Sequence, residues 1–231
     1  MHNKTNKTNR TIKTFRIRSR KLSIKQRNNI NIYWPLIGVN LIQEKFLIND
    51  FLNPYTPIIL EIGFGFGEYL INLCKKHKNI NFIGIEVYVP GISFCLEKIF
   101  KLNLKNIRII YSDALYFFLN YSQNIKFYKI NIFFPDPWPK RKHHKRRIIQ
   151  KSLIKIIFKN LFINGILHII TDSFSYYESI SKILKEFHGL HDISKIFKSF
   201  LSTKNIFNSR FRNKALMKKN KIYNMVYKKI F

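Results

Sequence analysis

Acidic residues are scarce in this 231-residue sequence, which has 12 Asp and Glu against 42 Lys and Arg. The formal net charge of +30 favours a nucleic-acid partner. A second explanation stays open, because the chain is rich in Ile, Asn, Lys, Phe and Tyr and has alanine only at positions 114 and 215. Mutational drift toward A+T-rich codons produces the same composition. The clustering of the charges is therefore more informative than their sum.

Cysteines and long apolar runs are also scarce. Cys74 and Cys95 lack the spacing of a metal site and are too few to cross-link a chain of this length. No stretch approaches the roughly 18 uninterrupted apolar residues of a membrane span. The basic N-terminus has no apolar core of the kind found in a secretory signal. We therefore expect a cytoplasmic monomer with no metal and no membrane association.

The order of polar and apolar segments indicates the architecture. Residues 1–35 are basic and nearly free of acids, which predicts a flexible N-terminal arm. Residues 36–231 alternate apolar strands with amphipathic helices, which predicts an α/β domain with a doubly wound, mostly parallel, Rossmann-like sheet and an antiparallel C-terminal strand. The expected strands are 58–60, 81–87, 107–111, 131–134, 166–170, 193–199 and 222–230, and the expected helices are 67–76, 91–102, 145–162 and 175–187.

Five of the few acids lie at or just past the ends of predicted strands. They are Glu61, Glu86, Asp113, Asp136 and Asp172. In a doubly wound sheet the carboxyl ends of the strands line one crevice, and ligands bind there. We therefore expect an acid-lined site, which suits a cationic sulfonium ligand better than a pyrophosphate.

A glycine-rich loop, EIGFGFG at residues 61–67, follows the first of these strands. Gly63 and Gly65 permit a tight turn and a close approach of the backbone to a ligand. Glu86 lies 19 positions after the last glycine of the loop, near the offset of about 20 at which an acid accepts the ribose hydroxyls. Asp113 can accept a hydrogen bond from an adenine amino group. The set predicts a nucleotide cofactor and leaves open S-adenosylmethionine (SAM) or a nicotinamide dinucleotide.

The run FPDPWPK at residues 134–140 follows the fourth predicted strand. Its prolines fix the backbone around Asp136, and Trp138 offers a face on which an unpaired base can stack. The densest basic run of the chain comes next, and each of its cations can neutralise an RNA phosphate. Each of these two predictions has an alternative. Trp138 can instead be buried in the core, and the basic run can be a solvated surface segment without a ligand. The predicted RNA contacts are Arg141, Lys142, His143, His144, Lys145, Arg146 and Arg147.

Five motifs in this order resemble those of the bacterial tRNA (guanine-N7-)-methyltransferase family: EIGFGFG, GIEVYVPGI, SDA, FFPDPWPKRKHHKRR and IITD. The similarity runs from about residue 16 to the C-terminus, and FPDPWPK is its most specific part. The resemblance implies that SAM is the cofactor and tRNA the partner. It also implies methylation at N7 of a variable-loop guanosine, position 46 in tRNA numbering.

The resemblance also assigns roles to single residues. It implies cofactor contacts at Glu61, Glu86, Asp113 and Asp136, and substrate contacts at Lys140 and Asp172. Two positions depart from the family pattern. Tyr88 stands where the family more often has His, and the family's C-terminal Thr-x-x-Glu corresponds to Ser209 and Arg212, with an arginine in place of the acid. Ser209 and Arg212 are the remaining predicted substrate contacts.

Guanine N7 has a lone pair and no proton, so its methylation needs positioning rather than a general base at N7. We expect Asp136, the predicted catalytic residue, and Asp172 to hold the guanine through its N1–H and 2-amino donors and to favour the cationic product. Two other hypotheses remain. A nicotinamide-dependent oxidoreductase would leave FPDPWPK and the basic run unexplained, and a tRNA-binding factor with a decayed site would have no reason to keep its acids together.

Overall fold

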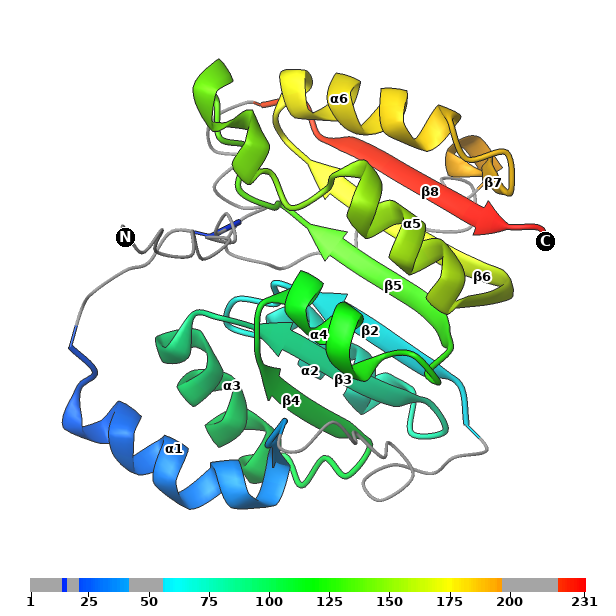
Figure 1. Cartoon of the computed structure of the whole chain (residues 1–231). Helices are drawn as coiled ribbons and strands as arrows, with labels where there is room; N and C mark the ends of the chain where they lie inside the picture. The colour runs from blue at the N-terminus through cyan, green and yellow to red at the C-terminus, as the bar shows by residue number, and fades with distance from the viewer. Residues whose placement is uncertain (1–13, 16–20, 42–55, 197–219) are drawn as a thin grey trace, which may run out of the picture.

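The computed structural model describes residues 14–15, 21–41, 56–196 and 220–231. Within them, eight strands form one sheet in the order β1-β4-β3-β2-β5-β6-β8-β7 (Figure 1). The strands are β1 (Gly38–Val39), β2 (Ile58–Ile62), β3 (Asn81–Glu86), β4 (Ile107–Tyr111), β5 (Phe127–Phe133), β6 (Leu161–Thr171), β7 (Leu190–Asp192) and β8 (Tyr223–Lys229). Strand β8 runs antiparallel to both of its neighbours, β6 and β7, and the other strand pairs are parallel. The predicted fold class, with its antiparallel C-terminal strand, is confirmed.

Helices cover both faces of this sheet. They are α1 (Ile24–Ile37), α2 (Glu68–Lys76), α3 (Val89–Lys101), α4 (Ala114–Tyr121), α5 (Lys151–Asn160) and α6 (Phe174–Lys185). Helices α4 to α6 belong to one core cluster, and α1 to α3 belong to the other. The central strands β2 and β3 are almost wholly buried because both of their faces are covered. No helix in the described part of the chain is long and apolar enough to cross a membrane.

The structure differs from the expected N-terminal arm, because residues 24–37 form α1. A capping box begins this helix: Gln26 N–H donates to Ser23 Oγ at 3.2 Å, and Ser23 N–H donates to Gln26 Oε1 at 2.9 Å. Asn29 Nδ2 donates to Glu97 Oε2 at 2.9 Å and joins α1 to α3. This stretch packs on the domain despite its positive charge.

Three further elements differ from the expected ones. The helix expected over 145–162 is divided into a 3₁₀ helix, η2 (Arg141–Arg146), and α5. The strand expected over 193–199 lies earlier, at β7, and residues 194–196 are helical. Helix α4, which was not expected, begins at the N-cap Asp113.

The order of the strands places a crevice at the middle of the sheet. From β2 the chain builds outward through β3 and β4 on one side and through β5 and β6 on the other. The order therefore reverses between β2 and β5, and the carboxyl ends of these strands form the usual ligand site of such sheets. Glu61 lies at this edge, opposite Asn131 of β5.

Candidate nucleotide and RNA site

The glycine loop has a backbone that other residues rarely adopt. Gly63, Gly65 and Gly67 have φ angles of 73°, 61° and 76°. The turn is closed by Gly67 N–H, which donates to the Phe64 carbonyl at 2.9 Å. A Cβ atom added to Gly63 would meet no atom within 4 Å. The loop thus leaves open space beside the backbone of Gly63, where a ligand could approach closely.

Glu86, at the end of β3, holds this loop in place. Its Oε2 accepts a hydrogen bond from Gly65 N–H at 2.7 Å, and its Oε1 accepts from Val87 and Tyr88 N–H at 2.7 and 2.9 Å. Burial raises the pKa of Glu86, the three N–H donors oppose this, and the charge of Asp136 raises the pKa further. Glu86 ends β3 and Asp136 follows β5, so both residues lie at the carboxyl edge of the sheet.

Glu61 is buried beside Glu86. Its Oε2 has no hydrogen-bond partner among the described residues. Burial and then the charge of Glu86 raise the pKa of Glu61 to about 8, and Lys129 opposes the shift. A buried carboxylate oxygen without a partner is costly until a donor or a cation reaches it. The pair therefore fits a cationic cofactor with ribose hydroxyls, such as SAM.

The raised pKa of Glu61 predicts a pH dependence of cofactor binding. A cation binds best to ionised Glu61, so SAM affinity should rise as the pH increases from about 6 to 8, where Glu61 loses its proton. Isothermal titration calorimetry with SAM and with uncharged S-adenosylhomocysteine measures the difference. The rise should be larger for SAM and absent in Glu61→Gln. Identical pH profiles for the two ligands in the native protein would contradict this role of Glu61.

Asp113, directly after β4, is the N-cap of α4. Its Oδ1 accepts from Tyr116 N–H at 3.1 Å, and its Oδ2 accepts from Thr14 Oγ1 at 3.0 Å. The Thr14 carbonyl in turn accepts from Trp138 Nε1 at 3.3 Å. Thr14 thus connects the end of β4 to the loop after β5.

The loop after β5 carries Asp136 in a strained backbone. Phe134 and Trp138, on either side of Asp136, have φ angles of 48° and 43°, which costs each about 1 kcal/mol or more. Phe134 N–H donates to the Ile170 carbonyl at 2.8 Å and fixes the start of the loop. Asp136 itself is exposed. Such strain persists only where the surrounding structure enforces it, so the loop presents Asp136 in a defined position.

The structure does not support Trp138 as an open stacking face. Its side chain is 4% exposed. The ring of His143 contacts it edge-on at 5.8 Å between centroids, and the Arg146 guanidinium lies 5.1 Å from the ring centre. The alternative of a structural Trp138 is therefore the correct one.

Most of the basic run is available to a ligand. Exposed cations are Lys140, Arg141, Lys142, Lys145 and Arg146, and His143 and His144 are half-buried. The run forms η2 directly after the Asp136 loop. Its exposed side chains fit the predicted contact with phosphates.

The prediction that Arg147 contacts RNA is wrong, because this side chain is only 2% exposed. Its Nε donates to the Pro137 carbonyl at 2.8 Å, and its Nη2 donates to Ser175 Oγ at 3.0 Å. The guanidinium also lies 4.7 Å from the ring centre of Tyr176. Arg147 thus joins the Asp136 loop to the start of α6 and has no open side for a phosphate. The sequence gives no sign of this, since all the cations of the run look alike.

Replacement of Arg147 separates this structural role from RNA binding. Arg147→Ala leaves the Pro137 carbonyl and Ser175 without this partner and should lower the free energy of unfolding by about 2–4 kcal/mol. Thermal unfolding measures the loss. The matched change Lys145→Ala should leave thermal stability unchanged and reduce the salt slope of tRNA binding by about 1. The reverse pattern would show that Arg147 contacts phosphate.

Asp172 follows β6 at the same edge of the sheet. Its Oδ2 accepts from Asn220 Nδ2 at 3.2 Å. Thr171 pairs with Tyr223, so the start of β8 lies beside Asp172. The predicted substrate residues Ser209 and Arg212 lie outside the described residues.

The sequence did not predict that Glu61 has buried polar neighbours on the adjacent strands. Glu61, Asn131 and His168 are register neighbours on β2, β5 and β6. Neither polar atom of the buried Asn131 amide has a hydrogen-bond partner within the described ranges. His168 Nε2 lies 2.7 Å from Asn224 Oδ1. Polar residues inside the otherwise apolar runs NINIFF and LHIIT were the available signal.

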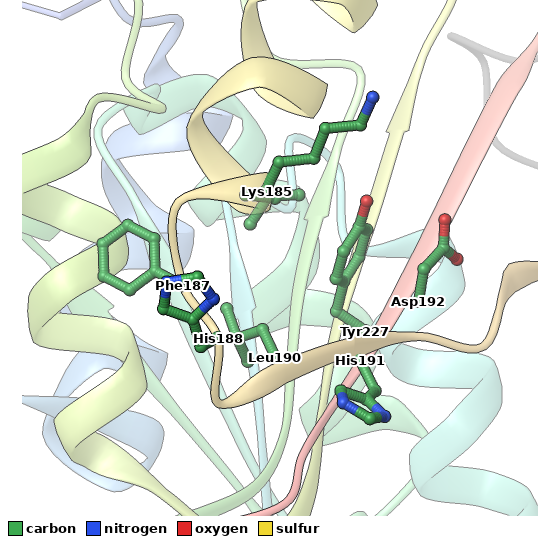
Figure 2. A pocket seen from close by; sticks show the side chains of 8 residues that line it. Lys185, Phe187, His188, Leu190, His191, Asp192 and Tyr227 are labelled. Carbon is green, nitrogen blue, oxygen red and sulfur yellow. The ribbon is translucent and has the colours of Figure 1, made fainter.

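A surface pocket lies away from these residues (Figure 2). It is lined by Leu184, Lys185, Phe187, His188, Leu190, His191, Asp192 and Tyr227. Figure 2 shows that these side chains come from the end of α6, from the turn that follows it, from β7 and from β8. Tyr227 pairs with Leu167, near the amino end of the parallel part of β6. The pocket contains none of the predicted site residues.

Comparisons with known proteins identify the family of this chain. Residues 55–225 match the family model described as "Putative methyltransferase". A tRNA (guanine-N(7)-)-methyltransferase of Buchnera aphidicola subsp. Baizongia pistaciae is 39% identical over 100% of this chain and 95% of its own. The enzyme of the same name from Histophilus somni is 35% identical over 80% of this chain and 74% of its own.

Solved structures support the fold alone. An rRNA methylase from Streptococcus thermophilus is similar with a TM-score of 0.52 and 11% identity, over 79% of this chain and 91% of that one. The plantazolicin methyltransferase BpumL, solved with S-adenosylhomocysteine, has a TM-score of 0.51 and 15% identity, over 76% of each chain. The family model and the sequence relatives confirm the resemblance seen in the motifs: the chain belongs to the tRNA (guanine-N(7)-)-methyltransferase family.

Proposed function

We propose that this protein transfers the methyl group of SAM to N7 of a guanine in tRNA, at position 46 of the variable loop. The observation that carries the proposal is the combination of a buried Glu61 Oε2 without a hydrogen-bond partner among the described residues, a glycine loop held by Glu86, and an exposed cationic 3₁₀ helix after the Asp136 loop. A cationic cofactor suits the buried acid and the glycine loop, and an RNA backbone suits the cationic helix. The printed names of the relatives agree with both.

The residues of this chain position the cofactor and the base. In this proposal Glu86 accepts hydrogen bonds from the ribose hydroxyls, Asp113 accepts one from the adenine amino group, and Glu61 balances positive charge. Bound SAM supplies an electrophilic methyl group. Guanine N7 would accept this group through its lone pair, and because N7 carries no proton, no residue of this chain would need to act as a base there.

In this proposal Asp136 and Asp172 orient the guanine. A carboxylate at either position can accept from the N1–H and the 2-amino group of the base. The positive charge that the ring gains on methylation is favoured by the same carboxylates. The exposed cations after Lys140 would hold the tRNA backbone, which makes binding sensitive to salt.

The proposal extends to the state of the protein in the cell. Cys74 and Cys95 are free and buried, which fits a reducing cytoplasmic environment. We propose a monomer that needs no metal, with one catalytic domain that includes α1. Sedimentation equilibrium and activity in the presence of EDTA test the first two statements.

Incubation with labelled SAM and bulk unmodified tRNA tests the function. Digestion to nucleosides should then place the label in 7-methylguanosine. Equilibrium dialysis should show binding of S-adenosylhomocysteine and none of NADH. Label in another nucleoside alone would overturn the substrate assignment, and NADH binding would favour the oxidoreductase hypothesis.

A further inference from the structure

Three aromatic rings stack at the edge of the sheet that carries Asp172. The ring centroids of Tyr177 and Tyr223 are 4.5 Å apart with a 22° angle between planes. Phe174 lies 6.4 Å from Tyr177 and 5.9 Å from Tyr223. We call Phe174, Tyr177 and Tyr223 the aromatic stack.

The aromatic stack has an open outer ring. Phe174 is 57% exposed, whereas Tyr177 and Tyr223 are half-buried. The ring planes of Phe174 and Tyr177 make an angle of 27°, and those of Tyr177 and Tyr223 make an angle of 22°. The exposed phenyl ring of Phe174 packs against two other rings, so its conformational freedom is restricted. A restricted, exposed aromatic ring favours binding of a flat ligand.

The stack lies beside the proposed guanine site. Phe174 follows Asp172 by two residues, and Tyr223 pairs with Thr171. The Lys221 Nζ lies 5.4 Å from the centre of the Tyr223 ring and adds a positive charge at the same place. Aromatic rings with an adjacent cation are the features with which proteins hold single-stranded nucleic acid.

We propose that the aromatic stack binds an unpaired nucleobase of the RNA substrate next to the target guanine, with that base lying on Phe174 and a phosphate near Lys221. This inference rests on the proposed function. A guanine presented to the crevice leaves its neighbour without a stacking partner. The ring of Phe174 replaces that partner, and because every base has a π face the contact does not depend on which base it is.

Substitution of Phe174 tests the inference. Phe174→Ala should raise the KM for tRNA on the order of 10-fold, with kcat at saturating tRNA, the SAM affinity and the thermal unfolding midpoint unchanged. Phe174→Trp should restore the native KM, and Phe174→Leu should not. Phe162→Ala is the matched control, because Phe162 is 48% exposed and lies at the opposite end of β6; it should leave the KM unchanged.

Salt dependence adds a second readout. Stacking releases no counterions, so Phe174→Ala should weaken tRNA binding without changing its salt slope, whereas Lys221→Ala should reduce the slope by about 1. A KM within twofold of the native value for Phe174→Ala, or full rescue by leucine, would overturn the stacking role. Failure of the native protein to form 7-methylguanosine would instead overturn the proposed function, so the two failures are distinguishable.

Discussion

Replacement of Asp136 by asparagine is expected to lower kcat by roughly 10²–10³-fold. The amide keeps the size of the side chain but loses the negative charge and turns one acceptor into a donor, so it opposes the N1–H and 2-amino donors of the guanine. Asp136 is exposed on its loop, and the bonds that shape the loop come from Phe134 and from Arg147 to Pro137. The fold should therefore be unchanged.

Single-turnover transfer from labelled SAM measures this effect without product release. Filter binding of tRNA should give the native affinity within a few-fold. Asp192→Asn is the matched control, because Asp192 is exposed on β7, outside the predicted site, and it should transfer at the native rate. Near-normal transfer by Asp136→Asn would remove Asp136 from the catalytic centre.

Replacement of Glu86 by glutamine is expected to weaken cofactor binding about 100-fold. The carboxylate accepts three backbone hydrogen bonds around the glycine loop, and an amide has a single oxygen to share among them. Loss of a charged acceptor costs about 1.5–3 kcal/mol, and the ribose loses its partner as well. Calorimetry should show similar losses for SAM and S-adenosylhomocysteine, which share the ribose.

This pattern separates Glu86 from Glu61, whose replacement should affect SAM more than the uncharged product. Glu97→Gln is the control, because Glu97 pairs with Lys101 at 2.6 Å on α3 and accepts from Asn29 of α1, outside the predicted site. Its cofactor affinity should be native. Unchanged binding by Glu86→Gln would show that the loop, rather than its acid, holds the cofactor.

The fold and the positions of the acids at the carboxyl edge of the sheet were predictable from the sequence for one physical reason. Parallel strands buried on both faces must be apolar, so the few acids that end them stand out and must meet at one edge. Glu61 and Glu86 end β2 and β3, and Asp113 follows β4. The charge of Glu86 raises the pKa of Glu61, and the charge of Asp136 raises that of Glu86, as expected for acids that share one edge of the sheet.

Side-chain burial was less predictable. Arg147 and Arg146 are adjacent and chemically identical, and only contacts with α6, some 30 residues later, bury Arg147. Trp138 looked like a stacking face because a sequence does not show that Arg146 and His143 cover its ring.

Charge density likewise obscured α1, although Ser23 and Gln26 have the spacing of a capping box. Asn131 shows the same limit from the opposite side. It is one polar residue within an apolar strand, and its significance appears only when the sheet places it beside Glu61. Local patterns thus predicted where strands end, whereas contacts between distant segments decided which side chains remain exposed.

The claim that guanine N7 is the acceptor is tested most directly by removing that atom. Two synthetic tRNAs, one with guanosine and one with 7-deazaguanosine at position 46, differ by a nitrogen that becomes C–H. With labelled SAM, the first should gain one methyl group per molecule and the second none, while both bind the protein equally. Equal methylation of both tRNAs would contradict the account.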